Sequence, residues 1–306
     1  MSDAAVPVRE GTIPFKGYET WYRIVGEREE PGKLPLLLLH GGPGAAHDYL
    51  EALDAMAGTG RRVIYYDQLG CGKSAIPESR PEMWTVDLFL EEVGFVRVAL
   101  GLERSHILGQ SWGGMLGMEY ALTQPAGLES LTIASSPASM IQWVEEANRL
   151  RGDLPPEVQD SLLRHEAAGS YDAPEYVDAV NVFYARHVCR DPVPEYVQRT
   201  YAAIAANPEV YHTMNGPSEF HVIGTLKSWD VIPRLGEIRV PTLVTSGRND
   251  EATPLIAETV HHGIPGSEWV VFENSSHMAH AEEPEAYMAV LDDFLTRVEQ
   301  QVSAGG

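Results

Sequence analysis

Short, dense hydrophobic runs alternate with helical patterns over the first third of the chain. Residues 34–39 and 62–66 are compact apolar runs, as expected of strands that are buried on both faces. Residues 86–102 have helical spacing, and residues 105–108 read as a further strand. Strands and helices in alternation predict an α/β fold, a mostly parallel sheet flanked by helices.

The two ends of the chain extend this pattern. Residues 12–25 are rich in β-prone side chains and are interrupted by Lys16-Gly17, which predicts a hairpin. Strands are expected again at 238–246 and 268–272. A closing helix follows, in which one apolar stripe that includes Tyr287 and Phe294 recurs at helical spacing and would pack on the sheet.

The middle of the chain has a different texture. Residues 138–229 are helical segments punctuated by proline, with no convincing strand. We therefore predict a helical cap domain at 138–229, inserted into a core domain formed by residues 1–137 and 230–306. With its cap, this core is the arrangement of the α/β-hydrolase fold.

Composition narrows the function classes. The 306 residues have a formal net charge of −22 and no cluster of Lys and Arg, which argues against a nucleic-acid partner. No apolar run approaches the roughly 20 residues that cross a bilayer, and the first ten residues do not read as a secretory signal. Cys71 and Cys189 lack CxxC spacing. We expect a cytoplasmic protein with no membrane partner, and the oligomeric state is left open.

The strongest chemical motif is Gly109-Gln-Ser-Trp-Gly113. It follows a predicted strand and opens an apolar segment, which is the strand-turn-helix context of a G-x-S-x-G nucleophile elbow. Small residues at Gly109 and Gly113 permit so sharp a turn, and the turn exposes the Ser111 hydroxyl. Ser111 is therefore the expected nucleophile.

A serine hydroxyl needs a base, and in this fold the acid and the base follow the serine in that order along the chain. Asp250 lies directly after the strand predicted at 238–246, and His277 directly after the strand at 268–272. Because sites in open α/β sheets gather at the carboxyl ends of strands, we predict a Ser111, Asp250, His277 triad.

Rival interpretations are weaker. His277 and His280 form an HxxH pair, but the helical HExxH arrangement with its glutamate is absent, so no metal is expected. The segment 70–74 ends like a phosphate-binding loop, yet the first glycine of that motif would fall at Asp67. No cofactor is expected.

An acyl-transfer site also needs donors for the oxyanion. His40-Gly-Gly-Pro-Gly44 follows the first buried strand, where this fold supplies half of the oxyanion hole. Pro43 has no N–H, so the backbone amide of Gly42 is the expected donor, together with that of Trp112. His40 is expected to brace the loop.

Four motifs together resemble the proline iminopeptidases. They are HGGPG at 40–44, DQLGCGKS at 67–74, GQSWGG at 109–114 and NGPSEF at 215–220. The likeness covers nearly the whole chain and is closest to the branch that contains the tricorn-interacting aminopeptidase and L-amino-acid amidases. Trp112 stands where some members of that branch have Tyr, which leaves the side-chain preference open.

The resemblance implies a site for the substrate's free amine. Family members bind the α-ammonium with acidic residues, and the matching positions here are Glu219 in NGPSEF and Glu251 directly after Asp250. Without the resemblance, Glu219 reads as a solvated position on a cap helix. Carboxylates that pair with an ammonium would discriminate against blocked substrates.

The expected function is that of a serine aminopeptidase that hydrolyses the amide bond after an unblocked N-terminal residue. Two alternatives keep the amine site: an amidase for amino-acid amides, and a peptidase that removes an aminoacyl group from a natural-product intermediate. An esterase of the same fold would not need Glu219 and Glu251. A non-catalytic receptor is disfavoured by the complete triad. The expected partner is a small peptide or aminoacyl amide.

Overall fold

The computed structural model describes residues 6–190 and 192–305. The first five residues of the predicted N-terminal tail and the last residue of the predicted core domain lie outside this description. No helix within the described residues is long and apolar enough to cross a membrane.

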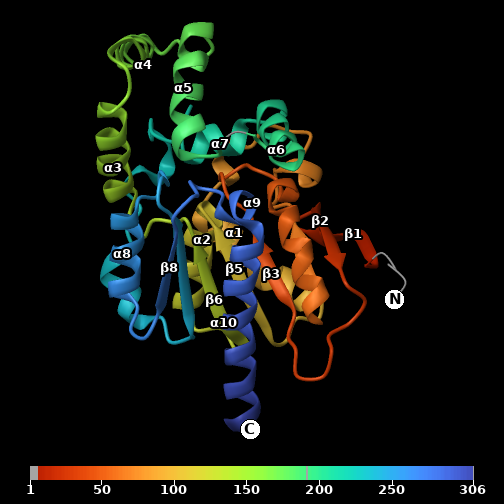
Figure 1. Ribbon diagram of the computed structural model, residues 1–306. Coiled ribbons are helices and arrows are strands. Elements are labelled where there is room, and N and C mark those ends of the chain that lie inside the picture. Colours follow the sequence, from red (N-terminus) through yellow and green to blue (C-terminus); the bar gives the residue numbers. More distant parts are fainter. Residues whose placement is uncertain (1–5, 191, 306) are drawn as a thin grey trace.

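One twisted sheet forms the centre of the molecule (Figure 1). Eight strands from the described part of the chain lie in the order β1-β2-β4-β3-β5-β6-β7-β8. Only the first two pairings are antiparallel; the others are parallel. The strands are β1 Val8–Phe15, β2 Tyr18–Val25, β3 Leu36–Leu39, β4 Val63–Tyr66, β5 Ser105–Gln110, β6 Leu128–Ala134, β7 Thr242–Gly247 and β8 Glu268–Phe272. The predicted fold class is confirmed.

Strand β6 escaped the sequence analysis. It lies between β5 and β7 in the sheet, yet its hydrophobic run is broken by Glu129, Ser130 and Thr132. Ser130 is fully buried and its hydroxyl is hydrogen-bonded to His106 Nδ1 at 2.8 Å. A polar side chain that finds its partner on the neighbouring strand lowers the apolar density on which the prediction relied.

Helices cover both faces of the sheet, so each buried strand contributes to two cores. Leu37 and Leu39 of β3 pack with α1 Val86–Ala99, α2 Trp112–Leu122 and α8 Pro254–Gly263. Leu36 and Leu38 face the opposite way, toward the 3₁₀ segment η1 His47–Thr59 and the closing helix α10 Pro284–Gly305. Alternation of side chains along β3 explains why its whole run is apolar.

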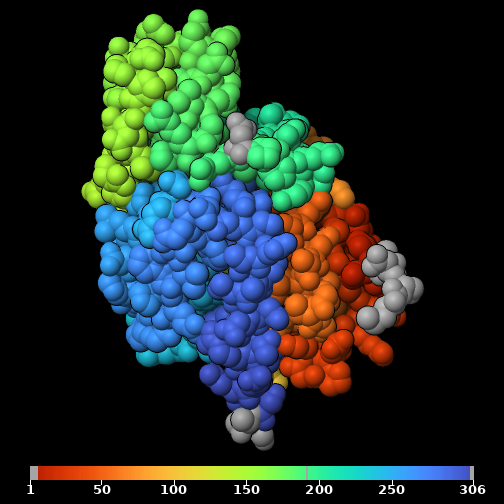
Figure 2. All heavy atoms as spheres, viewed as in Figure 1, coloured from red at the N-terminus to blue at the C-terminus, as the bar shows by residue number. Residues whose placement is uncertain are grey.

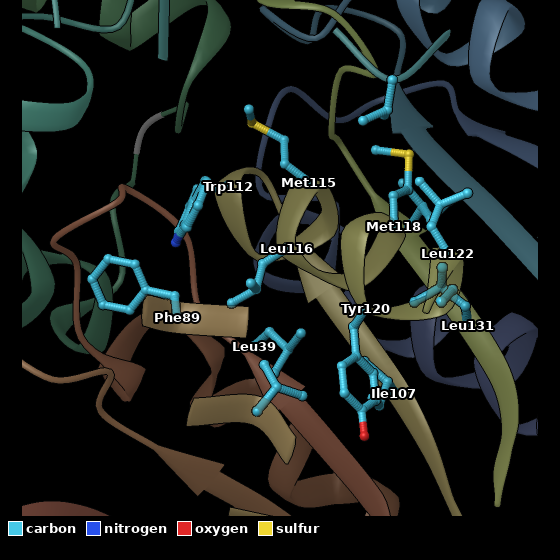
Figure 3. Close-up of a cluster of buried hydrophobic side chains, with 14 of the residues drawn as sticks. Leu39, Phe89, Ile107, Trp112, Met115, Leu116, Met118, Tyr120, Leu122 and Leu131 are labelled. Atoms are coloured by element: carbon cyan, nitrogen blue, oxygen red, sulfur yellow. The ribbon is translucent and has the colours of Figure 1, made fainter. Parts of the chain in front are cut away.

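Helix α2 lies in the middle of the first of these cores. It is buried on almost all sides, and Figure 3 shows Leu116, Met118 and Leu122 packed among side chains from the strands beneath, including Leu39 and Leu131. A helix that is apolar all round belongs inside a protein. The N-terminus of α2, directly after Ser111, is therefore held in a fixed place.

Five helices between β6 and β7 rise above the carboxyl ends of the strands, and they are the green part of Figure 1 and Figure 2. They are α3 Met140–Gly152, α4 Pro156–Ala168, α5 Pro174–His187, α6 Glu195–Ala206 and α7 Glu209–Met214. At their base, Ser139 and Asp230 form an isolated bridge, and Val231 N–H donates to Ala138 C=O at 2.9 Å. The chain thus leaves and rejoins the core at one point, and the domain limits of 138 and 229 stay a prediction.

Short helical turns complete the chain. They are η2 Gly72–Ser74, η3 Pro81–Met83, η4 Thr225–Ser228, η5 Ile232–Glu237 and α9 Ala279–Glu282.

A buried glutamate fastens the loop after β4 to its neighbours. Glu92 of α1 is inaccessible to solvent, accepts a hydrogen bond from Thr20 Oγ1 at 2.6 Å, and accepts another from Leu69 N–H at 3.1 Å. Burial raises the pKa of Glu92 to about 7, against the opposing effect of these hydrogen bonds. The nearby Asp67 charge raises this pKa further.

This gives a prediction for stability. The pKa of Glu92 is higher in the folded state than in the unfolded state. Its contribution to the free energy of unfolding is therefore fully present below about pH 4.5 and is lost as the pH rises through about 7. Glu92→Gln keeps the shape of the side chain but cannot ionise. The variant should therefore lack the parental decrease in unfolding free energy, up to roughly 3 kcal/mol, between these two pH values. Urea unfolding at pH 5 and pH 8 measures this. The exposed neighbour variant Glu91→Gln should keep the parental pH dependence.

Candidate active site

Ser111 occupies a strained turn between β5 and α2. Its φ of 56° and ψ of −124° lie in a region that residues other than glycine rarely adopt. A Cβ at Gly109 would lie 2.0 Å from Gly113 O, and a Cβ at Gly113 would lie 2.0 Å from Leu39 O. The two glycines of the motif are therefore required by close backbone approach, and the turn places the Ser111 side chain at the top of the sheet.

The two predicted oxyanion donors lie beside this serine. Trp112 is the first residue of α2, so its N–H has no partner within the helix. Gly42 adopts a φ of 109°, which favours glycine, and it borders the same cavity as Ser111. A Cβ at Gly41 would lie 3.1 Å from Ser111 Cβ, so this loop runs directly against the nucleophile turn.

His277 and Asp250 meet across the ends of β8 and β7. His277 Nδ1 is 2.8 Å from Asp250 Oδ1, and both side chains are buried. Asp250 also accepts hydrogen bonds from Ala252 N–H at 2.8 Å and from Gly247 N–H at 3.3 Å, which fix the carboxylate. Because a carboxylate only accepts, Nδ1 carries the proton and Nε2 offers a lone pair.

A cavity of about 690 Å³ opens between the core and the cap helices. Ser111 and His277 line it together with Gly42, and so do Glu219 and Glu251. Trp112 lines a much smaller adjoining pocket, which Ser111 and Glu219 also line. The seven predicted site residues thus surround one region, with Asp250 behind His277.

The carboxylates of Glu219 and Glu251 create an electrostatic demand in this cavity. Glu251 is 1% exposed, and within the described chain neither of its carboxyl oxygens has a hydrogen-bond partner. Burial, and then the charges of Glu219 and Asp250, raise the pKa of Glu251 well above its usual range. Burial also raises the pKa of Glu219, although His277 and Tyr211 act in the opposite direction. A cation would satisfy both groups.

Two tyrosines that the sequence analysis missed position Glu219. Tyr211 of α7 donates its hydroxyl hydrogen bond to Glu219 Oε1 at 2.8 Å, and Tyr184 of α5 accepts one from Glu219 N–H at 3.2 Å. Trp143 Nε1 donates to Glu219 C=O at 2.7 Å. These partners come from three different cap helices, and no local motif announces them. The sequence alone indicates only the apolar spacing of these helices.

Gln110 is a second addition to the site. Tyr49 donates its hydroxyl to Gln110 Oε1 at 2.7 Å and accepts from Gly41 N–H at 2.7 Å. Gln110 Nε2 donates to His277 C=O at 3.1 Å. This series of hydrogen bonds connects three parts of the site. They are the loop that contains Gly42, the residue Gln110 directly before the nucleophile, and the loop that carries His277. A glutamine inside the nucleophile motif was its one sequence signal.

His40 and His280 both hold loops in place. His40 Nε2 accepts from Gln68 N–H at 2.9 Å, and Gln68 Oε1 in turn accepts from Trp112 Nε1 at 2.8 Å. His280 Nε2 is 2.9 Å from Tyr49 C=O, and burial lowers the pKa of His280 to about 4. The second histidine of the HxxH pair is thus engaged with backbone.

A cluster of potential metal ligands lies at the start of η1. The side chains of His47, Asp48 and Glu51 are close enough to share an ion. His47 Nδ1, however, is 2.9 Å from Asp67 Oδ1, and Arg199 forms ion pairs with Asp48 and Glu51. The three side chains of this cluster are thus already engaged with other residues of the protein.

Comparison with known proteins agrees with the geometry. Residues 35–284 match the family described as alpha/beta hydrolase fold. A proline iminopeptidase of Clostridium botulinum is 43% identical over 95% of this chain and 99% of its own. The crystal structure of VinJ aligns with a TM-score of 0.92 and 47% identity, over 95% of this chain and 99% of VinJ. That of a Mycobacterium smegmatis proline iminopeptidase aligns with a TM-score of 0.89 and 48% identity, over 96% and 100%.

The chain belongs to the α/β hydrolases, as the fold and the strained serine turn define them. Within that class it is a member of the proline iminopeptidase family. The family resemblance seen in the four sequence motifs is confirmed.

The close approach of α2 to β3 generates a prediction. Gly113→Ala would place a methyl group 2.0 Å from the backbone oxygen of Leu39, and no rotamer change relieves a clash with backbone. We expect a loss of about 3 kcal/mol or more in unfolding free energy. Chemical denaturation measures it. The matched variant Gly152→Ala, whose new methyl meets nothing within 4 Å, should be neutral or slightly stabilising.

Proposed function

We propose that this protein is a serine aminopeptidase that hydrolyses the amide bond after an unblocked N-terminal residue. Ser111 is the nucleophile, His277 the base and Asp250 its orienting acid in this proposal. The observation that carries it is the pair Glu219 and Glu251, two carboxylates at the same cavity as Ser111, one of them buried with both oxygens unpartnered. Names borne by relatives, including proline iminopeptidase, support it.

The proposed reaction proceeds in two acyl-transfer steps. His277 Nε2 removes the Ser111 hydroxyl proton as Oγ attacks the first carbonyl carbon, and the amides of Gly42 and Trp112 stabilise the oxyanion. His277 then gives that proton to the leaving amine, which leaves an aminoacyl ester on Ser111. Water attacks this ester with His277 as base, and the free amino acid departs. Asp250 stabilises the transient imidazolium throughout.

The amine site explains how such an enzyme would select one residue from a chain end. An ammonium held by Glu219 and Glu251 places the next carbonyl at a fixed distance from the charge, close to Ser111. A blocked amine has no charge, and would leave a buried carboxylate without a partner. Substrate selection then rests on Glu219 and on Glu251, whose carboxyl oxygens lack a hydrogen-bond partner in the described chain.

The cavity of about 690 Å³ has apolar as well as acidic walls. Its walls include Tyr176, Val180 and Ile204, which offer apolar surface to a leaving group. This favours, as a second candidate, removal of an aminoacyl group from a bulky amine such as a natural-product intermediate. The amidase alternative, whose leaving group is ammonia, gains no support from the size of the cavity. A small peptide or aminoacyl amide as substrate, and a cytoplasmic location, are part of the proposal.

The nucleophile assignment predicts the effect of one substitution. Ser111→Ala should reduce kcat for alanine, proline and leucine p-nitroanilides by about 10⁴-fold or more, because the aminoacyl-enzyme cannot form. Its circular dichroism spectrum and melting temperature should stay close to those of the parent. Turnover that survives at more than a hundredth of the parental rate would rule out Ser111 as nucleophile.

The amine site predicts a change in selectivity. Glu219→Gln retains the acceptor for Tyr211 but removes charge, so kcat/KM for free aminoacyl p-nitroanilides should fall about 10- to 100-fold. Rates on N-acetylated analogues, already low, should change little. The exposed α3 variant Glu145→Gln serves as control and should match the parent. An unaltered preference for the free amine in Glu219→Gln, or equal parental rates on both substrate forms as an esterase would show, contradicts the proposal.

A further inference from the structure

Glu251 lies unusually close to the base that must activate Ser111. Its Oε1 is 3.6 Å from His277 Nε2, the nitrogen opposite the one bound to Asp250. This gap is just beyond hydrogen-bonding range, and a small torsional change in the glutamate would close it. Neither carboxyl oxygen of Glu251 has another hydrogen-bond partner in the described chain. His277 Nε2 is thus close enough to become a partner of this carboxyl.

Among the described residues, the charged groups that act on Glu251 are the acids Glu219 and Asp250. The titratable groups facing this region come from the loops after β7 and β8, from α5 and α6, and from the segment after α7. They are Asp250, His277, Tyr184, His187, Tyr201 and Glu219. His187 approaches through its backbone oxygen, 3.2 Å from Glu251 N. Burying a third carboxylate beside Asp250 and Glu219 without a cation is unfavourable, which favours the neutral acid.

We propose that Glu251 gates the catalytic base: in the empty site its carboxyl O–H donates to His277 Nε2, and the substrate's ammonium releases that nitrogen. The inference rests on the proposed function and adds regulation to the same site. The step is balanced. The ammonium arrives with one positive charge, the neutral Glu251 acid loses one proton to solvent through the cavity, and the resulting carboxylate pairs with the ammonium.

The gate changes where selectivity arises. A neutral ligand leaves the proton on Glu251, so the Nε2 lone pair remains engaged and cannot accept the Ser111 proton. A ligand with a free ammonium frees the lone pair at the moment of binding. Blocked substrates would therefore be disfavoured in the chemical step as well as in binding.

The test separates the base from the substrate. Diisopropyl fluorophosphate is neutral, has no ammonium and labels an activated serine, so its rate of reaction with Ser111 reports the availability of His277. Saturating ethylammonium chloride at pH 7 should accelerate labelling by about two- to tenfold, the factor that the net strength of one hydrogen bond sets. Tetramethylammonium chloride, which has no N–H, should not. Glu251→Ala should label at the faster rate without any cation and should not respond to ethylammonium. The exposed variant Glu285→Ala should respond like the parent.

Proton release supplies an independent measurement. Calorimetric titration of the parent protein with ethylammonium, in two buffers with different ionisation enthalpies, should show about one proton released per site, and Glu251→Ala should show none. If the parent releases no proton, the gate is contradicted even where Glu251→Ala does not fold.

The outcomes distinguish the gate from the function beneath it. If ethylammonium competes with aminoacyl p-nitroanilides but does not accelerate labelling, the gate is wrong and the amine site stands, whether or not a proton is released. If ethylammonium neither competes, nor accelerates labelling, nor releases a proton, the amine site itself is wrong, and the gate falls with it.

Discussion

The site depends on one close backbone contact, the approach of Gly113 to the end of β3. A side-chain carbon there would sit 2.0 Å from Leu39 O, so the start of α2 lies against the strand with no space between them. This contact fixes the position of Ser111 relative to the loop that carries Gly42, since that loop begins directly after Leu39. The proposed nucleophile and the proposed oxyanion donor are therefore held in fixed positions relative to each other. Packing on both sides maintains the strained dihedral angles of Ser111.

Hydrogen bonds connect this backbone contact to the other elements of the site. Gln110 and Tyr49 link the Gly42 loop to the loop of His277, while Gln68 links His40 to the Trp112 ring. All of these side chains are buried, and in a low dielectric such bonds are costly to break. The imidazole and the oxyanion loop are consequently placed by shared partners, so a disturbance at one is transmitted to the other.

Sequence reasoning reached the fold and the proposed triad because both are written in local patterns. Short apolar runs marked β3 and β4, and a motif with its strand and helix marked Ser111. It missed β6, where buried Ser130 and Thr132 reduce the apolar density, and it missed Tyr211 and Tyr184, whose roles arise only when cap helices pack around Glu219. Glu219 itself was identified by family resemblance alone. Side chains that act through tertiary contact leave little periodic or spacing signal for a single sequence to reveal.

The cap supplies one of the two glutamates that are proposed to bind the substrate amine. Glu219 is carried by the cap segment after α7, whereas Glu251 follows Asp250 at the end of a core strand. In the proposed function both carboxylates bind the ammonium, so neither the cap nor the core would form that site alone. α7 also touches the oxyanion loop directly, since a Cβ at Gly44 would lie 2.8 Å from Tyr211 N. Tyr211 thus takes part both in the packing of the cap on this loop and in the alignment of Glu219. In the proposed function, the charged end of the substrate would therefore bind only where the loop of the proposed oxyanion donor is already in place.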